Sequence, residues 1–376
     1  MLDLNYASHL TSTTMKSDRS DFVRSTNRGL VRHAVFPVAG LGAALLPATK
    51  ACPKEMLPIV DRPMIQYAVE EAAAAGLTRM IFVTGRGKRA IEDHFDRAYE
   101  LEHQLTARDD SEALEILRAT VPAGITFSYV RQREPSGLLD AIRMARPLVG
   151  DEPFAVVLPD QLFDSDRPAL SQLVDVYALH RSSVMGAERV RSDTRDGSHL
   201  IGAELDTSTK QAVSTLVHVP PVGAAFASLA TAGRFVFTRA AWQSFEHAAN
   251  AGASGSPLVA AIRNLMLRER VFACVIDGRR YDCGSRLGYV DAQIAFAKKR
   301  PEFWSAMQNG LDSVHAPQRA RERAVGGIAD ATERQHSADA SQPQHSADAQ
   351  PQHSIDASQP QHSADAQPQH SADVAL

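Results

Sequence analysis

Cysteines are scarce in this sequence, and long apolar runs are absent. The three cysteines, Cys52, Cys274 and Cys283, are odd in number and lack the spacing of metal ligands, so they fit a reducing compartment. No run of 18 apolar residues occurs, which excludes a conventional transmembrane helix. The first thirty residues contain no apolar segment of the kind that a secretory signal needs. These features predict a cytoplasmic protein that does not insert into a membrane.

An excess of basic residues is also missing. The formal net charge is −4, which gives no reason to expect binding to nucleic acid or to an anionic membrane through bulk electrostatics. With 376 residues, 44% of them hydrophobic, the chain is long enough for two domains or for one large α/β domain with appendages.

Large apolar residues almost disappear from residues 335–376. Five copies of Gln-His-Ser-(Ala/Ile)-Asp occur there, starting nine, eight, nine and eight residues apart. Such a segment cannot bury enough apolar surface to offset the entropy lost on ordering, so it predicts a disordered tail. Weak metal binding by the clustered His and Asp side chains is the alternative, although a flexible array holds no fixed ligand geometry.

Between these ends, short apolar runs alternate with helical patterns, which is typical of an α/β protein with a mostly parallel sheet. We expect a flexible leader at 1–32, one domain at 33–305, a linker at 306–334 and the tail at 335–376. The expected strands are 34–38, 80–84, 125–130 and 154–158, and the expected helices are 65–76, 89–117, 137–146, 255–270 and 287–299.

A glycine-rich turn follows the first expected strand. The turn Gly40-Leu41-Gly42 can present backbone N–H groups to an anion, because glycine allows close approach and positive φ. Lys50 and Lys54 lie just downstream and supply the point charges that phosphate binding uses. The pattern predicts a phosphate or nucleotide site.

The segment from Pro37 to Asp61 resembles the bacterial UTP–glucose-1-phosphate uridylyltransferases. The resemblance continues through Leu158-Pro-Asp160, Gly233-Arg234 and Tyr281 to Tyr289, and it covers roughly residues 33–300. It implies a Rossmann-like nucleotidyltransferase fold, in which a mixed, mostly parallel sheet is flanked by helices. It also implies a reaction in which a phosphate oxygen of glucose 1-phosphate attacks the α-phosphorus of UTP, giving UDP-glucose and pyrophosphate. That chemistry depends on Mg²⁺, positive charge and in-line positioning.

The resemblance also implies roles for single residues. The positions that match the nucleotide site are Ala39, Gly40, Leu41, Gly42, Gln132 and Gly137, of which the last two lie beside the uracil. Lys54 matches a catalytic lysine that contacts phosphate, and Gly202 matches a glycine next to the sugar. Asp160 and Asp282 match carboxylates that hold Mg²⁺, an ion that takes few protein carboxylates together with substrate phosphate oxygens.

Several charged positions of the family are changed here. Where the family has Gly-x-Gly-Thr-Arg, with an arginine that meets the triphosphate, this sequence has Ala43 and Ala44. His218 and Val219 replace the glutamate and lysine of a Val-Glu-Lys-Pro motif on the sugar side. An acidic segment has become 253–260, and a Lys-Gly-Leu-Gly-His segment has become Ser-Gly-Leu-Leu-Asp, ending at Asp140.

Three functional hypotheses follow. The first is a divergent, Mg²⁺-dependent uridylyltransferase that supplies UDP-glucose for cell-surface polysaccharide. The second is a non-catalytic paralogue that pairs with an active uridylyltransferase and regulates it. The third is a nucleotidyltransferase with altered sugar specificity. Because members of the family are commonly homo-oligomers, we expect either self-association or a hetero-oligomer with an active paralogue.

Overall fold

The computed structural model describes residues 31–189, 200–205, 213–218, 229–251 and 256–315. The chain divides into two units, residues 1–306 and 307–376. Of the second unit only the end of one helix is described. The repeat tail, the expected leader up to residue 30 and the expected linker from residue 316 lie outside the described residues.

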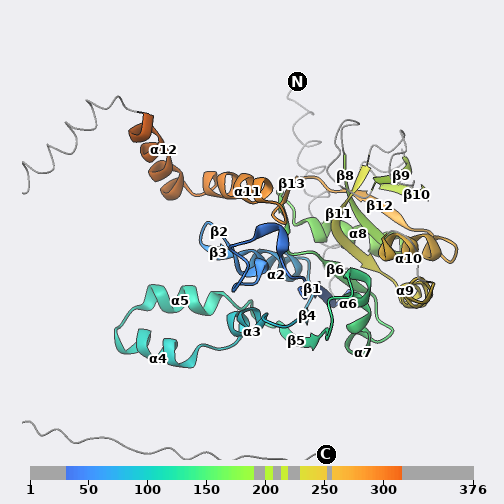
Figure 1. Cartoon of the computed structure of the whole chain (residues 1–376), viewed down its shortest axis with the longest axis horizontal. Helices are drawn as coiled ribbons and strands as arrows, with labels where there is room; N and C mark the ends of the chain where they lie inside the picture. Colours follow the sequence, from blue (N-terminus) through green and yellow to red (C-terminus); the bar gives the residue numbers. More distant parts are fainter. Residues whose placement is uncertain (1–30, 190–199, 206–212, 219–228, 252–255, 316–376) are drawn as a thin grey trace, which may run out of the picture. The chain divides into compact units, whose positions relative to one another are not determined.

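Strands and helices are interspersed along the described chain (Figure 1). The strands are β1 (His33–Pro37), β2 (Pro58–Ile59), β3 (Arg62–Pro63), β4 (Arg79–Thr84), β5 (Thr126–Arg131), β6 (Phe154–Val157), β7 (Gln161–Asp164), β8 (Val184–Arg189), β9 (Leu200–Leu205), β10 (Val213–His218), β11 (Leu229–Phe237), β12 (Phe272–Val275) and β13 (Arg279–Asp282). The α-helices are α2 (Met64–Ala74), α3 (Arg89–Phe95), α4 (Tyr99–Ala107), α5 (Ser111–Ala119), α6 (Leu138–Met144), α7 (Arg146–Val149), α8 (Ala169–His180), α9 (Ala240–Asn250), α10 (Pro257–Met266), α11 (Arg286–Lys298) and α12 (Pro301–His315). Two short 3₁₀ helices, η1 (Ala43–Leu45) and η2 (Lys54–Met56), follow β1.

Nine of these strands form one mixed sheet in the order β5-β4-β1-β6-β11-β8-β12-β10-β9. The strands β5, β4, β1 and β6 pair in parallel, as do β8 and β12. Strands β11 and β10 pair antiparallel with their neighbours and therefore run against the other seven. The predicted Rossmann-like, mostly parallel α/β fold is confirmed. The carboxyl ends of the parallel strands β5, β4, β1 and β6 lie at one edge of the sheet, where ligands of α/β proteins bind.

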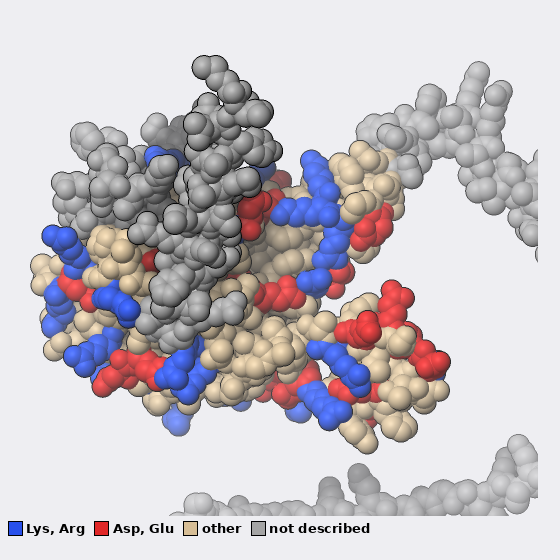
Figure 2. All heavy atoms as spheres, turned by 180° about the vertical axis from the view of Figure 1, so that it is seen from behind, with Lys and Arg blue, Asp and Glu red and all other residues tan. Residues whose placement is uncertain are grey.

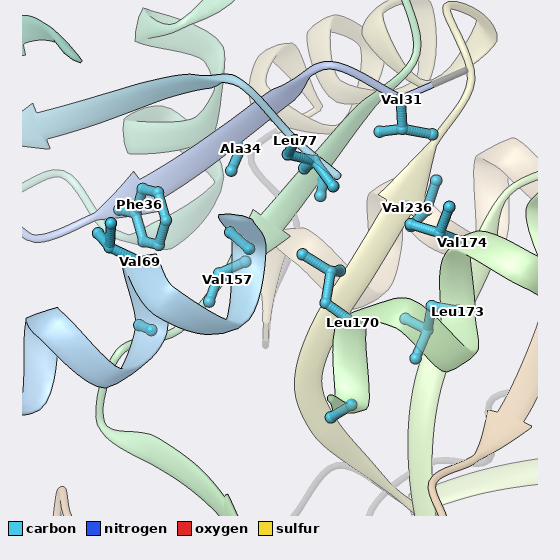
Figure 3. Close-up of a cluster of buried hydrophobic side chains, with 14 of the residues drawn as sticks. Val31, Ala34, Phe36, Val69, Leu77, Val157, Leu170, Leu173, Val174 and Val236 are labelled. Atoms are coloured by element: carbon cyan, nitrogen blue, oxygen red, sulfur yellow. The ribbon is translucent and has the colours of Figure 1, made fainter. Parts of the chain in front are cut away.

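Helices cover both faces of this sheet because successive side chains of a strand point to opposite faces. Phe36 of β1 belongs to a core cluster with residues of α2 and α8. The adjacent Val35 belongs to a second cluster, which α6, α9 and α10 close on the other face. Figure 3 shows the first cluster, in which Leu170 and Leu173 of α8 lie near Val236 of β11.

A smaller apolar cluster joins the segment after β1 to the C-terminal part of the domain. Ile59 and Met64 pack there with Leu162 of β7, Tyr281 of β13 and Ala292 of α11. Strands β7 and β13 form a separate antiparallel pair. The cluster therefore holds two distant parts of the sequence against each other beside the end of β6.

Two helical segments differ from the expected pattern. The single helix expected over 89–117 is divided into α3, α4 and α5. Asp96 ends α3 in an extended conformation, and Asp109 has a left-handed φ of 56° between α4 and α5. Helix α12 was not expected from the sequence, and it extends past residue 305 to His315. The change in composition after residue 305 favoured a linker and hid the helical pattern that continues to His315.

On the described surface, basic and acidic side chains are interspersed over the face shown in Figure 2. None of the helices in the described segments has both the length and the apolar character needed to cross a bilayer.

Candidate active site

The loop that follows β1 depends on Gly42. Its φ of 70° lies in the left-handed region, and a Cβ atom there would lie 3.2 Å from the Cβ of Thr49 and 3.3 Å from the Cβ of Lys54. The Thr49 hydroxyl donates a 2.7 Å hydrogen bond to the Gly42 carbonyl oxygen. Glycine therefore lets the turn fold back tightly against the segment that carries Lys54.

A cavity of about 260 Å³ lies next to this loop. Four of the predicted nucleotide residues line it, namely Ala39, Gly40, Gln132 and Gly137. Lys54 and Asp160 line it as well, and the remaining lining residues are Pro37, Pro135, Leu138, Ala141, Leu158 and Pro159. Leu41, by contrast, is 73% exposed and is not part of the lining. Gly42 is not part of the lining either, so four of the six predicted nucleotide residues converge on one largely apolar cavity with a polar end.

Gln132 is held in place at the wall of this cavity. Its backbone N–H donates to the carbonyl oxygen of Thr84, at the end of β4. Its side chain is buried, and Nε2 donates to Asp140 Oδ2 at 2.8 Å and to the Gly137 carbonyl oxygen at 3.4 Å. Asp140 is on α6, and the described residues offer no partner to Oε1 of Gln132. The amide oxygen is therefore the atom that remains for a ligand.

Lys54 and Asp160 form an ion pair at the polar end of the cavity. Lys54 Nζ lies 2.5 Å from Asp160 Oδ2, and the side chains are 22% and 18% exposed. Burial alone would lower the pKa of Lys54, but the charge and hydrogen bond of Asp160 outweigh it and raise the pKa above its ordinary value. Lys54 therefore remains charged, and Asp160 neutralises it.

A second ion pair fixes the 3₁₀ turn that carries Lys54. Glu55 and Lys88 are 1% and 5% exposed at the side chain, and their charged atoms lie 2.6 Å apart. Burial raises the pKa of Glu55, against the opposing effect of Lys88. This pair ties η2 to the start of α3 and thereby limits the movement of Lys54.

Asp160 and Asp282 lie side by side although they are far apart in the sequence. The Cys283 N–H donates 2.8 Å to the Asp160 carbonyl oxygen, and β13 pairs with β7. A Cβ atom on Gly284 would lie 3.0 Å from Asp282 Oδ1 and 3.2 Å from Asp160 Oδ2, so both carboxylates border the same small space. The two predicted metal ligands are brought together.

The chemistry of this pair fits a hard divalent cation. Asp282 Oδ1 accepts from Gln161 Nε2 at 2.9 Å and from the Gly284 N–H at 3.1 Å. Within the described part of the chain, Asp282 Oδ2 and Asp160 Oδ1 receive no hydrogen bond. One oxygen of each carboxylate is therefore left without a hydrogen bond, and an ion such as Mg²⁺ held here would complete its shell with water and phosphate oxygens. No group of three or more His, Cys, Asp or Glu side chains in these segments offers a fuller metal site.

Gln161 connects Asp282 to a charged pair that the sequence reasoning missed. Its Oε1 accepts from Arg280, which also forms an ion pair with Glu188 of β8. The Gln161 amide is thus oriented at both ends, with Nε2 toward Asp282. The signal in the sequence was the position of Gln161 directly after Asp160.

Arg234 holds the loop that carries Asp160 from behind. It is fully buried, and Nε and Nη2 donate to the two carboxylate oxygens of Glu71 at 2.9 and 2.8 Å. It also donates to the carbonyl oxygens of Leu158 and Gln161 at 2.9 and 2.7 Å. These two residues flank Pro159 and Asp160. The Gly233-Arg234 motif had signalled the family, but only the structure shows this contact.

The sugar side is described only in part. Gly202 of β9 lies opposite His218 of β10 in the strand pairing, so the predicted sugar-binding glycine faces the position where the family has a glutamate. Val219 and residues 253–255 lie outside the described residues.

Positive charge is sparse among the residues that line the cavity. Ala43 and Ala44 are exposed in η1 and carry no charge. Lys54 is the one cation among the described residues that line the cavity, and it is already paired with Asp160.

The family model "Nucleotidyl transferase" matches residues 34–299. The chain belongs to this family. It is 44% identical over 274 residues to a UTP–glucose-1-phosphate uridylyltransferase of Bacillus subtilis (strain 168), covering 72% of this chain and 93% of the relative. A UTP–glucose-1-phosphate uridylyltransferase of Staphylococcus epidermidis is 43% identical over 277 residues, covering 72% and 94%. Within the nucleotidyl transferases, the chain is therefore a member of the UTP–glucose-1-phosphate uridylyltransferases.

Solved structures agree with this membership. A UTP-bound UDP-glucose pyrophosphorylase from Acinetobacter baumannii superimposes with a TM-score of 0.68 at 33% identity, covering 75% of this chain and 98% of that one. A UDP-glucose pyrophosphorylase complexed with UDP-glucose gives a TM-score of 0.61 at 36% identity, covering 72% and 100%.

Proposed function

We propose that this nucleotidyl transferase binds UTP but converts UTP and glucose 1-phosphate to UDP-glucose and pyrophosphate weakly or not at all. The observation that carries the proposal is the charge balance of the cavity, where Lys54 is the one cation of the described lining and is paired with Asp160. A site that retains its base-binding end and has lost positive charge at its phosphate end favours binding over turnover.

Nucleotide binding is supported by the apolar part of the cavity. Leu138 and Leu158 offer surfaces on which a pyrimidine ring can lie, and Gly40 exposes backbone beside it. The unpaired Oε1 of Gln132 is suited to accept the N3–H of uracil. The comparison structure with bound UTP makes this the nucleotide to test first.

Asp160 and Asp282 would hold Mg²⁺ through the two oxygens that have no other partner. The ion would draw phosphate oxygens together and neutralise part of their charge. Binding of Mn²⁺, followed by electron paramagnetic resonance, tests the site without turnover. Asp282→Asn should abolish binding, whereas Asp164→Asn on the same strand pair should not. Equal binding by both variants would contradict the assignment.

Turnover requires positive charge at the phosphates and in-line approach of the acceptor oxygen to the α-phosphorus. Lys54 can move from Asp160 to an incoming phosphate, because Lys54 and Asp160 both line the cavity. Ala44 and Val219 provide no charge where the family has an arginine and a lysine. Loss of a single preorganised contact of this kind typically lowers kcat by about 10²–10³.

A rescue experiment tests this explanation. The double substitution Ala44→Arg with Val219→Lys should raise the rate of pyrophosphate release at least about tenfold, because it restores two preorganised charges. Ala43→Arg with Val219→Lys is a control that adds the same charge at the neighbouring position. An equal rate in wild type and double variant would show that charge loss is not what limits turnover.

Two alternatives remain as separate hypotheses. His218 favours altered sugar specificity, because it replaces a glutamate of the family and lies opposite Gly202. Pyrophosphate release with a panel of sugar 1-phosphates tests it, and inactivity with every sugar would dismiss it.

Regulatory pairing with an active paralogue is favoured because the chain keeps the family's fold but lacks charged side chains of the family's site. Co-purification tests it, and a strictly homo-oligomeric preparation would count against it. Cytoplasmic location stays a prediction.

A further inference from the structure

The side chain of Gln132 could face the cavity with either end of its amide, and the two ends recognise opposite partners. The amide oxygen accepts a hydrogen bond, whereas the amide nitrogen donates one. Uracil carries a donor at N3, and cytosine carries an acceptor there. The orientation of this one amide therefore decides which pyrimidine the cavity accepts.

Asp140 fixes the orientation of the Gln132 amide. Its Oδ2 accepts from Gln132 Nε2 at 2.8 Å, and a carboxylate has no proton to donate to the amide oxygen instead. The Gly137 carbonyl oxygen, the second partner of Nε2 at 3.4 Å, is also only an acceptor. Both neighbours thus select the same amide orientation, with Oε1 left for the ligand.

Asp140 is itself held in position. Arg143, one turn along α6, forms an ion pair with Asp140 Oδ1 at 3.5 Å. Arg143 is bound in turn to Glu246 of α9 at 2.5 Å. Oδ1 of Asp140 therefore pairs with Arg143, and Oδ2 accepts from Gln132.

We propose that Asp140 is a specificity-determining positioning residue, which locks the Gln132 amide so that the cavity accepts a uracil nucleotide and rejects a cytosine nucleotide. The inference rests on the proposed function, because it assumes that the nucleotide base lies against Gln132. Asp140 occupies the position of a histidine in the family's Lys-Gly-Leu-Gly-His segment, and a neutral imidazole can donate or accept. The carboxylate makes the selection stricter in this chain.

The test is the ratio of dissociation constants for CTP and UTP, measured by calorimetry with Mg²⁺ and the full chain. The wild type should bind UTP at least about tenfold more tightly than CTP, because the cytosine N3 would face an acceptor. Asp140→Asn should lower the ratio to about threefold or less, because an asparagine amide can pair with either end of Gln132. It should change the UTP affinity far less than the ratio.

Asp93→Asn on α3 is the matched control, since it removes the same charge from an exposed site, and it should keep the wild-type ratio. If Asp140→Asn does not fold, Asp140→His replaces it and should relax the ratio in the same way. A ratio unchanged in the Asp140 variant, or a wild type that binds UTP and CTP equally, would overturn the assignment of Asp140. A wild type that binds neither nucleotide would instead overturn the proposed function, and with it this inference.

Discussion

The ammonium nitrogen of Lys54 lies 2.5 Å from Asp160 Oδ2, so a candidate phosphate-binding lysine and a candidate metal-binding aspartate neutralise each other. In the absence of ligand, each group satisfies the charge of the other in a partly buried position. If the proposed function holds, a triphosphate that binds with a divalent cation would replace this pair with two new ones, Lys54 with phosphate and Asp160 with metal. The pair thus keeps both groups in place between binding events.

Replacing Lys54 tests its role at the phosphates. Lys54→Met should weaken UTP binding by about tenfold or more, because a charge-assisted hydrogen bond is lost in a partly desolvated position. Lys50→Met is the control, since Lys50 lies in the same segment but is exposed and does not line the cavity. UTP affinity can be measured by calorimetry. Equal weakening by both substitutions would indicate a general charge effect in place of a contact by Lys54.

Breaking the buried pair of Arg234 and Glu71 should destabilise the domain strongly. Arg234→Met leaves the Glu71 carboxylate without its cationic partner and frees the carbonyl oxygens that flank Asp160. Removing one member of a buried pair costs about 3–5 kcal/mol of unfolding free energy. Urea denaturation measures the loss. The exposed pair of Arg89 with Asp93 provides the comparison, and Arg89→Met should change stability by less than about 1 kcal/mol. Similar losses of unfolding free energy in both variants would contradict a special role of Arg234 in holding the loop that carries Asp160.

The acid sensitivity of the fold should depend partly on His94. Burial lowers the pKa of this imidazole in the folded protein, whereas in the unfolded chain it stays near 6.5. As the pH falls below about 6.5, the unfolded state gains a proton before the folded state does, so stability is lost. Nε2 faces Gln66 Oε1 at 3.1 Å, and glutamine can replace it as a donor.

The variant His94→Gln should therefore lose less stability than the wild type between pH 7 and pH 5. One proton contributes a slope of at most about 1.4 kcal/mol per pH unit. Unfolding free energies from urea denaturation at each pH give the comparison. Identical slopes in wild type and variant would show that His94 does not contribute.

The fold is predictable from the sequence because the strongest signals lie in its core. The apolar runs at β1, β4, β5 and β6 are short and bounded by turn residues, and each forms a parallel strand within a residue or two of the expected limits. The long helical pattern after β4 was misread, because Asp96 and Asp109 break it through backbone conformations that apolar periodicity does not reveal. Nor does periodicity give the strand order, which places β11 between β6 and β8.

The site was predictable only where a motif names its residues. Asp160 and Asp282 were expected to share a metal, and the pairing of β7 with β13 brings them together. The partners of these groups were not predictable, because hydrogen bonds such as Arg234 to Leu158 or Gln132 to Asp140 depend on packing between distant segments. The sequence located the cavity, and packing determines how its polar atoms are oriented.

A nucleotide site that persists while turnover is weak or lost should be recognisable in a single comparative assay. Pyrophosphate release should be followed for the full chain with UTP, glucose 1-phosphate and Mg²⁺, beside the Bacillus subtilis relative under identical conditions. The rate should be at least about 10²-fold below that of the relative, as the loss of preorganised charge implies. A rate within about tenfold of the relative would contradict weak or lost turnover, because each missing charge should lower kcat by about 10²–10³.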